Sequence, residues 1–367
     1  MIINFLKKEP SLVLAVTAFI AVTLLLNDTS VRGNLLFETV IFIIVLGVII
    51  FSSLGVVRHA EKLAYKFGEP YGTMILTFSA VIVEIIMISA FVLNNENNPT
   101  LARDTIYSTL MILLNGLIGF IMLVGGIRYG EQKFNLKSSN SYLSMIIGII
   151  GLALFLPDYL PDKLEYSYTV FLILICLLLY AFFIKLQSGN HNFYFRFEEQ
   201  QNKNNKESPE HLPPKSEIKT PYNISMLVSL IVIISLLAEY LSIFIDDEMS
   251  AFHFPESIGG LVIAMIIISP EGLTAIRAGL NNDMQRVVNI TLGSVLSTIS
   301  LTIPAVLILS FITGKEIILG LAPVQATIVI ISLMVGTLSC KDGETNALQG
   351  FIHFALFIAF IFLTIVL

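Results

Sequence analysis

Charged side chains are scarce in this sequence. Only 13% of the 367 residues are Asp, Glu, Lys or Arg, whereas a soluble globular chain carries about a quarter. Hydrophobic residues make up 55% of the chain, and the mean hydropathy is +0.84. These few charged residues are not enough to form a surface that faces water everywhere. Lipid must therefore cover much of the protein surface. This excludes a soluble globular protein and predicts an all-α polytopic membrane protein.

Cysteine and the common catalytic motifs are also scarce. The two cysteines, Cys176 and Cys340, lie in or beside apolar runs, which makes a disulfide framework a poor interpretation. The chain has no HExxH or GxGD motif and no serine–histidine pair at matching depth in two spans. The five histidines show no metal-ligand spacing. We therefore expect a transporter rather than an enzyme, with no cofactor and no nucleic-acid partner.

The chain is rich in long apolar runs, and eleven of them are candidates for transmembrane helices. We interpret the first as a retained helix rather than a signal peptide, because no obvious cleavage site follows it. A ten-span alternative would lay this first helix on the membrane surface. The eleven segments run approximately over Leu12–Leu26, Leu35–Val57, Tyr71–Leu93, Thr105–Ile127, Tyr142–Leu156, Tyr168–Ile184, Ile224–Ile245, Ile258–Gly279, Val287–Ile312, Ile317–Leu338 and Ala347–Val366.

The lysines and arginines indicate the orientation of these spans. If the N-terminus is cytoplasmic, seventeen of the 21 fall in inside loops and four in outside loops. Such asymmetry follows the positive-inside rule. It predicts a cytoplasmic N-terminus and an external C-terminus. We expect a multi-pass protein of the plasma (inner) membrane. The oligomeric state stays open, and a homo-oligomer is compatible with the sequence.

A polar insertion divides the chain at residues 187–222. It contains EEQQNKNNKESPEHLPPKSE, which has too few aliphatic residues to fold alone. We interpret it as a flexible cytoplasmic linker, with a regulatory or cation-sensing loop as the alternative. The predicted organisation is a lone first helix with its outer loop (1–34), a five-helix repeat (35–186), the linker (187–222) and a second five-helix repeat (223–367).

Two of the spans repeat one pattern, Gly-x11-Glu-x8-Leu-Asn-Asn, at an offset of 187 residues. The third span crosses the membrane outward and the eighth inward, so the two halves are predicted to be inverted copies, as in many secondary transporters. Pro270 removes a backbone donor, so we expect a helix break beside Glu271. The matched residues are Gly72, Glu84, Leu93, Asn94 and Asn95 with Gly259, Glu271, Leu280, Asn281 and Asn282.

Glu84 and Glu271 both fall near the middle of a span. A charged carboxylate at that depth costs about 2.5–3.5 kcal/mol on insertion scales. No lysine or arginine lies in the middle of any span, so each glutamate is expected either to be protonated or to share a cation from solution. Two carboxylates with neighbouring oxygens form a hard site suited to Ca²⁺, and two protons would neutralise the same site. Glu84 and Glu271 are thus the candidate metal ligands.

Polar side chains follow each glutamate in the next span. Hydroxyls in membrane helices either bond the preceding turn and pack helices, or line a path for cations. Glu239 is either an interfacial acid or part of an acidic outer gate, and His353 is either a packed histidine or a proton relay. The cation- and proton-binding candidates beside the two glutamates are Ser108, Thr109, Ser294 and Ser297. The candidates for a gate or proton path are Glu239, Asn115, Asn289 and Gln325.

Four motifs carry a resemblance to a known family: GEPYGT, GGIRYGEQKFN, ISPEGLTAIRAGLNNDMQ and GETNALQG. Over nearly its whole length the chain resembles the cation/proton exchanger branch of the Ca²⁺/cation antiporter superfamily, and within it the ChaA type, which exchanges calcium or sodium and potassium for protons. The resemblance implies an essential glutamate in each of two inverted helices, at Glu84 and Glu271. It also implies serine-containing stretches in the following helices, here at Ser108 and Thr109 and at Gly293, Ser294 and Ser297.

The chain departs from this family in one respect. Many calcium-selective members carry a Gly-Asn pair shortly before each glutamate. At those places this chain has Val81, Ile82 and Val83 in the first repeat and Ile268, Ser269 and Pro270 in the second. We expect alternating-access exchange of cytoplasmic Ca²⁺, with Na⁺ or K⁺ as further cations, for external H⁺. The alternatives are a Na⁺-driven Ca²⁺ exchanger, a Na⁺/K⁺:H⁺ antiporter with little Ca²⁺ activity, and a passive channel. The expected partners are inorganic cations, protons and the lipid bilayer.

Overall fold

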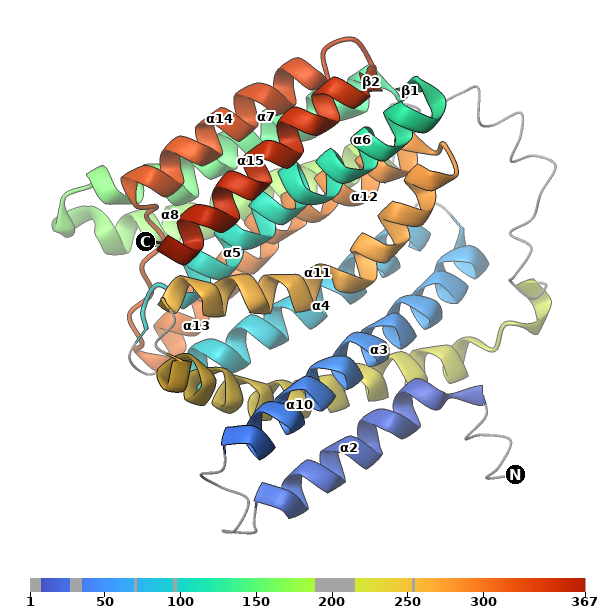
Figure 1. Ribbon diagram of the computed structural model, residues 1–367, viewed down its shortest axis with the longest axis vertical. Helices are drawn as coiled ribbons and strands as arrows, with labels where there is room; N and C mark the ends of the chain where they lie inside the picture. Colours follow the sequence, from blue (N-terminus) through green and yellow to red (C-terminus); the bar gives the residue numbers. More distant parts are fainter. Residues whose placement is uncertain are drawn as a thin grey trace. The chain divides into compact units, whose positions relative to one another are not determined.

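The computed structural model describes residues 8–26, 35–68, 71–94, 98–188, 215–252 and 255–366, and most of these are helical (Figure 1). Within this part of the chain, nine helical stretches are long and apolar enough to cross a membrane. Two shorter apolar helices, Pro10–Leu25 and Pro323–Ser339, bring the number of apolar helical segments to the predicted eleven. The prediction of an all-α polytopic membrane protein is confirmed.

The chain packs into two compact units. The first comprises Met1–Leu101 and His211–Pro270, and the second comprises Ala102–Glu210 and Glu271–Leu367. Elements of the first unit are α2 (Pro10–Leu26), α3 (Leu35–Phe67), α4 (Tyr71–Asn94), the 3₁₀ turn η6 (Lys215–Glu217), α10 (Thr220–Phe252) and the first part of α11 (Glu256–Leu280).

In the first unit, α3 and α10 pack along one another, and α2 and α4 each pack against both of them (Figure 1). Val45, Ile49 and Leu237 are fully buried in this core. On the opposite face of α3, Ile43 and Ile44 are 59% and 55% exposed. Because the outer face is as apolar as the core, lipid can cover it, and close packing rather than removal of apolar surface from water holds these helices together.

The second unit contains three interrupted spans. Ile112–Leu117 (η1), Gly151–Phe155 (η2) and Thr298–Thr302 (η7) are π-helical, whereas η3 (Pro157–Tyr159) and η4 (Asp162–Leu164) are 3₁₀ turns. The other elements are α5 (Leu101–Met111), α6 (Ile118–Tyr129), β1 (Glu131–Lys133), α7 (Leu136–Ile150), α8 (Glu165–Ser188), the rest of α11, α12 (Met284–Ser297), α13 (Ile303–Thr313), α14 (Pro323–Ser339), β2 (Glu344–Asn346) and α15 (Ala347–Val366).

Glycines bring α6 and α15 into backbone contact. A Cβ on Gly119 would lie 2.7 Å from the backbone nitrogen of Phe354, and one on Gly350 would lie 2.2 Å from that of Leu123. Small residues at such a crossing permit close helix packing in membranes. The loops at one end of this pair form a short antiparallel ladder, β1 with β2, in which Gln132 lies opposite Thr345. Hydropathy gave no sign of this ladder.

The two units do not coincide with the two halves of the sequence. The first unit takes α3 and α4 from the first half and α10 and the start of α11 from the second. The second unit takes the remaining spans of both halves. Each unit therefore draws corresponding spans from both halves, and the division into inverted five-helix repeats stays a prediction about the sequence.

The structure differs from the sequence-based expectations at two prolines. The expected helix break beside Glu271 is wrong, because α11 runs through Pro270 without interruption; membrane helices tolerate proline where neighbouring groups accommodate the lost bond. The boundary between the two units nevertheless falls between Pro270 and Glu271. The tenth span begins at Pro323 rather than Ile317, since proline suits the first turn of a helix.

The predicted linker is shorter than 187–222 at both ends. Helix α8 continues to Ser188 and α10 begins at Thr220. Residues 189–214, which carry most of the predicted linker, and residues 27–34 of the predicted first outer loop lie outside the described residues.

Candidate cation-binding site

Glu84 lies in α4, in the first unit. Its side chain is 5% exposed. Nearby on the same helix, Val81, Val83 and Met87 are also buried. The acid is thus placed within an apolar span, as the sequence predicted.

Glu271 lies in α11 and is the first residue of this helix that belongs to the second unit. It is half-buried, and the buried Pro270 precedes it. The Ser294 hydroxyl of α12 donates a hydrogen bond to its Oε2. No ion pair among the described residues includes Glu271. A hydrogen-bond donor therefore supports this carboxylate, and no basic side chain in the described part of the chain neutralises it.

The other hydroxyls of α12 follow the packing alternative. Ser297 donates to the Ser294 carbonyl at 2.9 Å, and Thr291 donates to the Val287 carbonyl at 2.8 Å. Both hydroxyls thus have partners within their own helix. The structure therefore brings Ser294 to Glu271 and leaves Ser297 bonded one turn away.

Buried hydroxyls of a second kind occur in and before the π-helical stretches. The hydroxyl oxygens of Thr109, Ser300 and Thr302 are buried and have no hydrogen-bond partner among the described residues. Buried polar groups normally have a partner, so these oxygens are suited to a cation or water. Ser108, beside Thr109, is 1% exposed. Ser300 and Thr302 were not identified from the sequence, although the Thr-x-Ser-x-Thr run of the ninth span could have drawn attention to them.

The π-helical stretches η1 and η7 occupy corresponding places in the two halves. The offset of 187 that aligns the two glutamates carries η1 (Ile112–Leu117) onto residues 299–304, which overlap η7 (Thr298–Thr302). Both stretches lie one span after a glutamate helix and contact α12. π-Helical turns are rare and occur frequently at functional sites. Their presence makes both spans candidates for a functional site, which hydropathy could not have indicated.

Asn115 belongs to a buried polar network in the second unit. Its amide nitrogen donates to the Ser332 hydroxyl at 2.8 Å, so its oxygen faces His353 Nδ1 at 3.0 Å. The other ring nitrogen, Nε2, lies 3.2 Å from the Ser339 hydroxyl, which can donate to it. A neutral imidazole therefore satisfies every partner. This arrangement favours the packing interpretation of His353 and gives Asn115 a role in joining η1, α14 and α15.

Of the three remaining gate candidates, two have local side-chain partners and one is exposed. Asn289 accepts from Gln285 at 2.9 Å. Gln325 caps the start of α14, since its oxygen accepts from the Ala322 backbone at 3.1 Å and its nitrogen donates to Asp104 at 3.2 Å. Glu239 is exposed. None of these contacts, within the part of the chain that the structure describes, reaches Glu84 or Glu271, so their gating role stays a prediction.

Groups at the end of α6 and just after it hold the end of the helix that carries Glu271. The buried Gln132 side chain donates to the Gly279 carbonyl and to Asn282, each at 3.1 Å. Tyr129 donates to the Leu280 carbonyl at 2.6 Å. The sequence reasoning missed this role, although Gln132 lies in one of the motifs that carry the family resemblance.

Glu84 belongs to the first unit and Glu271 to the second. The geometry of each glutamate is therefore known within its own unit. Joint binding of one ion by both carboxylates stays a prediction.

Comparison with known proteins identifies the family. The model of a family described as sodium/calcium exchanger protein matches residues 37–189 and 222–366. The sodium-potassium/proton antiporter ChaA of Escherichia coli K12 is 35% identical over 314 residues, 85% of each chain. The putative ionic transporter y4hA of Sinorhizobium fredii is 34% identical over 317 residues, 84% of each chain.

Solved structures agree on the fold. The chain superposes on a crystal structure of the Ca²⁺/H⁺ antiporter YfkE with a TM-score of 0.70 at 17% sequence identity, and the match covers 100% of both chains. At this identity the likeness shows the fold alone. With the family match over most of its length, the chain belongs to the sodium/calcium exchanger protein family.

Proposed function

We propose that this protein is a secondary active antiporter of the plasma membrane that exchanges cytoplasmic Ca²⁺ for external H⁺ by alternating access. Glu84 and Glu271 bind either the cation or protons, and Ser294 supports Glu271. The N-terminus lies in the cytoplasm and the C-terminus outside, as the distribution of lysine and arginine indicates.

One observation carries this proposal. Glu271 lies within a membrane span, bonded to a serine hydroxyl and outside every described ion pair. A bare carboxylate is costly in that environment. Either a proton or a cation from solution removes the cost, and a group that alternates between these two ligands couples their fluxes. If Glu84 acts in the same way, one Ca²⁺ and two protons neutralise the pair equally.

A second candidate, exchange of Na⁺ or K⁺ for H⁺ with little Ca²⁺ activity, has support of its own. The relative that is 35% identical is a sodium-potassium/proton antiporter. The residues before each glutamate, 81–83 and 268–270, supply no amide side chain. Ca²⁺ takes six to eight oxygen ligands. The absence of amide oxygens from these two stretches therefore favours cations that need fewer oxygen ligands.

The test is cation-dependent proton movement in everted vesicles. A pH gradient is set, and Ca²⁺, Na⁺ or K⁺ is added separately while a dye reports the internal pH. We expect at least one of the three cations to dissipate the gradient in vesicles with the parent protein. The Glu84→Gln and Glu271→Gln proteins, at equal abundance in the membrane, should lose this activity.

The matched control is Glu316→Gln, the same chemical change at an exposed residue between α13 and α14. This variant should exchange at the parent rate. Parent-like exchange by either Glu84→Gln or Glu271→Gln would refute the role of that glutamate. Dissipation that follows the membrane potential and needs no added cation would indicate a channel instead.

A further inference from the structure

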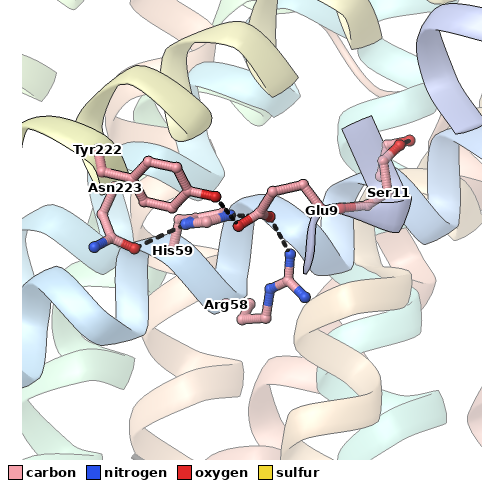
Figure 2. A network of polar contacts seen from close by, with 7 residues as sticks. Glu9, Ser11, Arg58, His59, Tyr222 and Asn223 are labelled. Carbon is pink, nitrogen blue, oxygen red and sulfur yellow. Dashed lines mark hydrogen bonds and ion pairs between the residues drawn. The ribbon is translucent and has the colours of Figure 1, made fainter. Parts of the chain in front are cut away.

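A buried polar cluster joins the start of α2 to α3 and α10 in the first unit (Figure 2). We call it the Glu9 cluster. Its centre is the Glu9 carboxylate, which is 1% exposed and directly precedes α2. The other members are Arg58 and His59 of α3 and Tyr222 and Asn223 of α10. Nothing in the proposed exchange uses these side chains.

Glu9 accepts three short contacts. The Tyr222 hydroxyl donates to Oε1 at 2.5 Å, and Arg58 donates to Oε2 at 2.6 Å. The Nε2 of His59 also lies 2.9 Å from Oε2. Each donor comes from a helix other than α2, so this one carboxylate links the segment before α2 to both α3 and α10.

His59 has an acceptor at each of its two ring nitrogens. Nε2 faces the Glu9 carboxylate, which cannot donate when ionised. Nδ1 lies 2.9 Å from the side-chain oxygen of Asn223. The orientation of that amide follows from its nitrogen, which donates to the Lys219 carbonyl at 2.9 Å.

This geometry selects the charged form of the ring. A neutral imidazole has one N–H and can satisfy one of the two acceptors, whereas an imidazolium has two and satisfies both. His59 is fully buried, so water does not easily replace a lost partner. His353 provides the contrast, because its second neighbour is a hydroxyl that can donate to a neutral ring.

The charged and titratable groups around His59 come from each segment that meets there. The segment before α2 supplies Glu9, α3 supplies Arg58 and Lys62, and α10 supplies the Tyr222 phenol. Lys8 lies 4.8 Å from the centre of the Tyr222 ring. Among these groups Glu9 makes the direct contact with the ring, and Arg58 shares the same carboxylate oxygen. The proton on His59 is therefore held by one carboxylate with several positive charges nearby.

We propose that His59 is a proton-binding site separate from Glu84 and Glu271, and that its proton fastens the start of α2 to α3 and α10. With the proton bound, Glu9 and Asn223 both hold the ring. When the proton leaves, the ring keeps one of these two contacts, and the start of α2 loosens. In the predicted orientation this end of the unit faces the cytoplasm, so the ligand is a cytoplasmic proton.

The charge on the ring is measured directly by nuclear magnetic resonance of the full-length protein in detergent, with ¹⁵N-labelled histidine. The His59→Gln spectrum identifies the signals of His59 among those of the five histidines. We expect an N–H on both ring nitrogens at pH 6 and the loss of one as the pH is raised to 9. A ring with a single N–H over this whole range would overturn the proposal.

The loosening of α2 is measured by maleimide labelling of Ser11→Cys in a protein whose two native cysteines are replaced by alanine. Ser11 is 3% exposed and lies two residues after Glu9, in the first turn of α2. The labelling rate of Ser11→Cys is divided by that of an exposed reference, Lys341→Cys. As the pH is raised, this ratio should increase about tenfold, with the same midpoint as the loss of the N–H from the His59 ring. A corrected rate that does not change with pH would refute the clamp.

Two variants at Asn223 keep the proposal testable if His59→Gln folds poorly. Asn223→Asp places a second carboxylate against Nδ1 and should move both transitions to higher pH. Asn223→Leu removes the acceptor and should move them to lower pH. Identical midpoints in both variants would overturn the assignment. Because neither readout needs transport, both are also run with Glu271→Gln, so failure here and failure of the proposed exchange are distinguishable.

Discussion

Ser294 offers the sharpest test of the candidate cation site, because its hydroxyl is the described partner of Glu271. The Ser294→Ala substitution removes this donor and one oxygen, with little change in volume. Ser294 is half-buried in α12, and the Asp283 side chain caps the start of this helix. We therefore expect the helix to persist and the effect to fall on the carboxylate.

The expected size of the effect follows from the charge on the partner. A hydrogen bond to a charged group contributes about 1.5–3 kcal/mol. If this bond is present with the ionised, cation-binding form of Glu271 and absent with the protonated form, its loss weakens cation binding by the same amount. At about 1.4 kcal/mol per factor of ten, the half-saturating cation concentration should rise between about 10-fold and about 150-fold.

The assay is the vesicle exchange described above, run over a range of cation concentrations at one fixed pH. Ser144→Ala, at an exposed position of α7, is the matched control and should leave the half-saturating concentration unchanged. The maximal rate at saturating cation separates weaker binding from slower exchange. The reasoning is refuted if Ser294→Ala binds the cation as tightly as the parent while Glu271→Gln abolishes exchange.

Two further predictions concern stability in detergent. Gly350→Ala should lower the midpoint of thermal unfolding, because its Cβ would lie 2.2 Å from the Leu123 nitrogen and overpacking costs about 1–3 kcal/mol. Gly148→Ala, with no atom within 4 Å, is the control, and equal midpoints would contradict the packing argument. The second concerns the pKa of Glu9: burial raises it, but the hydrogen bonds of Tyr222 and His59 and the charges of His59 and Arg58 outweigh burial and lower it below 4.5. Ionised Glu9 therefore stabilises the fold above about pH 4.5, and this contribution is lost as the pH falls through the lowered value. The thermal midpoint of Glu9→Gln should lie below that of the parent at neutral pH and approach it as the pH is lowered through that value. A difference that does not change with pH would refute this.

The places of the spans and of the two glutamates could be predicted from the sequence, because both depend on composition along one segment. A carboxylate in an apolar run such as α4 is visible without knowledge of its neighbours. The break expected at Pro270 failed because a proline removes only one helical bond, and the surroundings of α11 decide whether the helix continues.

The features that sequence reasoning missed all depend on the third dimension. The π-helical stretches η1 and η7 differ from α-helix by a shift in backbone bonding that side-chain periodicity does not record. The buried hydroxyls of Ser300 and Thr302 stand out because the described residues around them supply no hydrogen-bond partner, which the sequence does not show. Similarly, Gln132 is an ordinary loop glutamine in the sequence, and its importance arises from the end of α11 that it meets.

The β1–β2 ladder has a consequence for how this protein changes shape. It ties the segment after α6 to the segment before α15, while glycines let the same two helices touch backbone to backbone. Sliding one helix past the other would tear the ladder and force the glycine crossing apart. In the proposed exchange we therefore expect α6 and α15 to move together as one body.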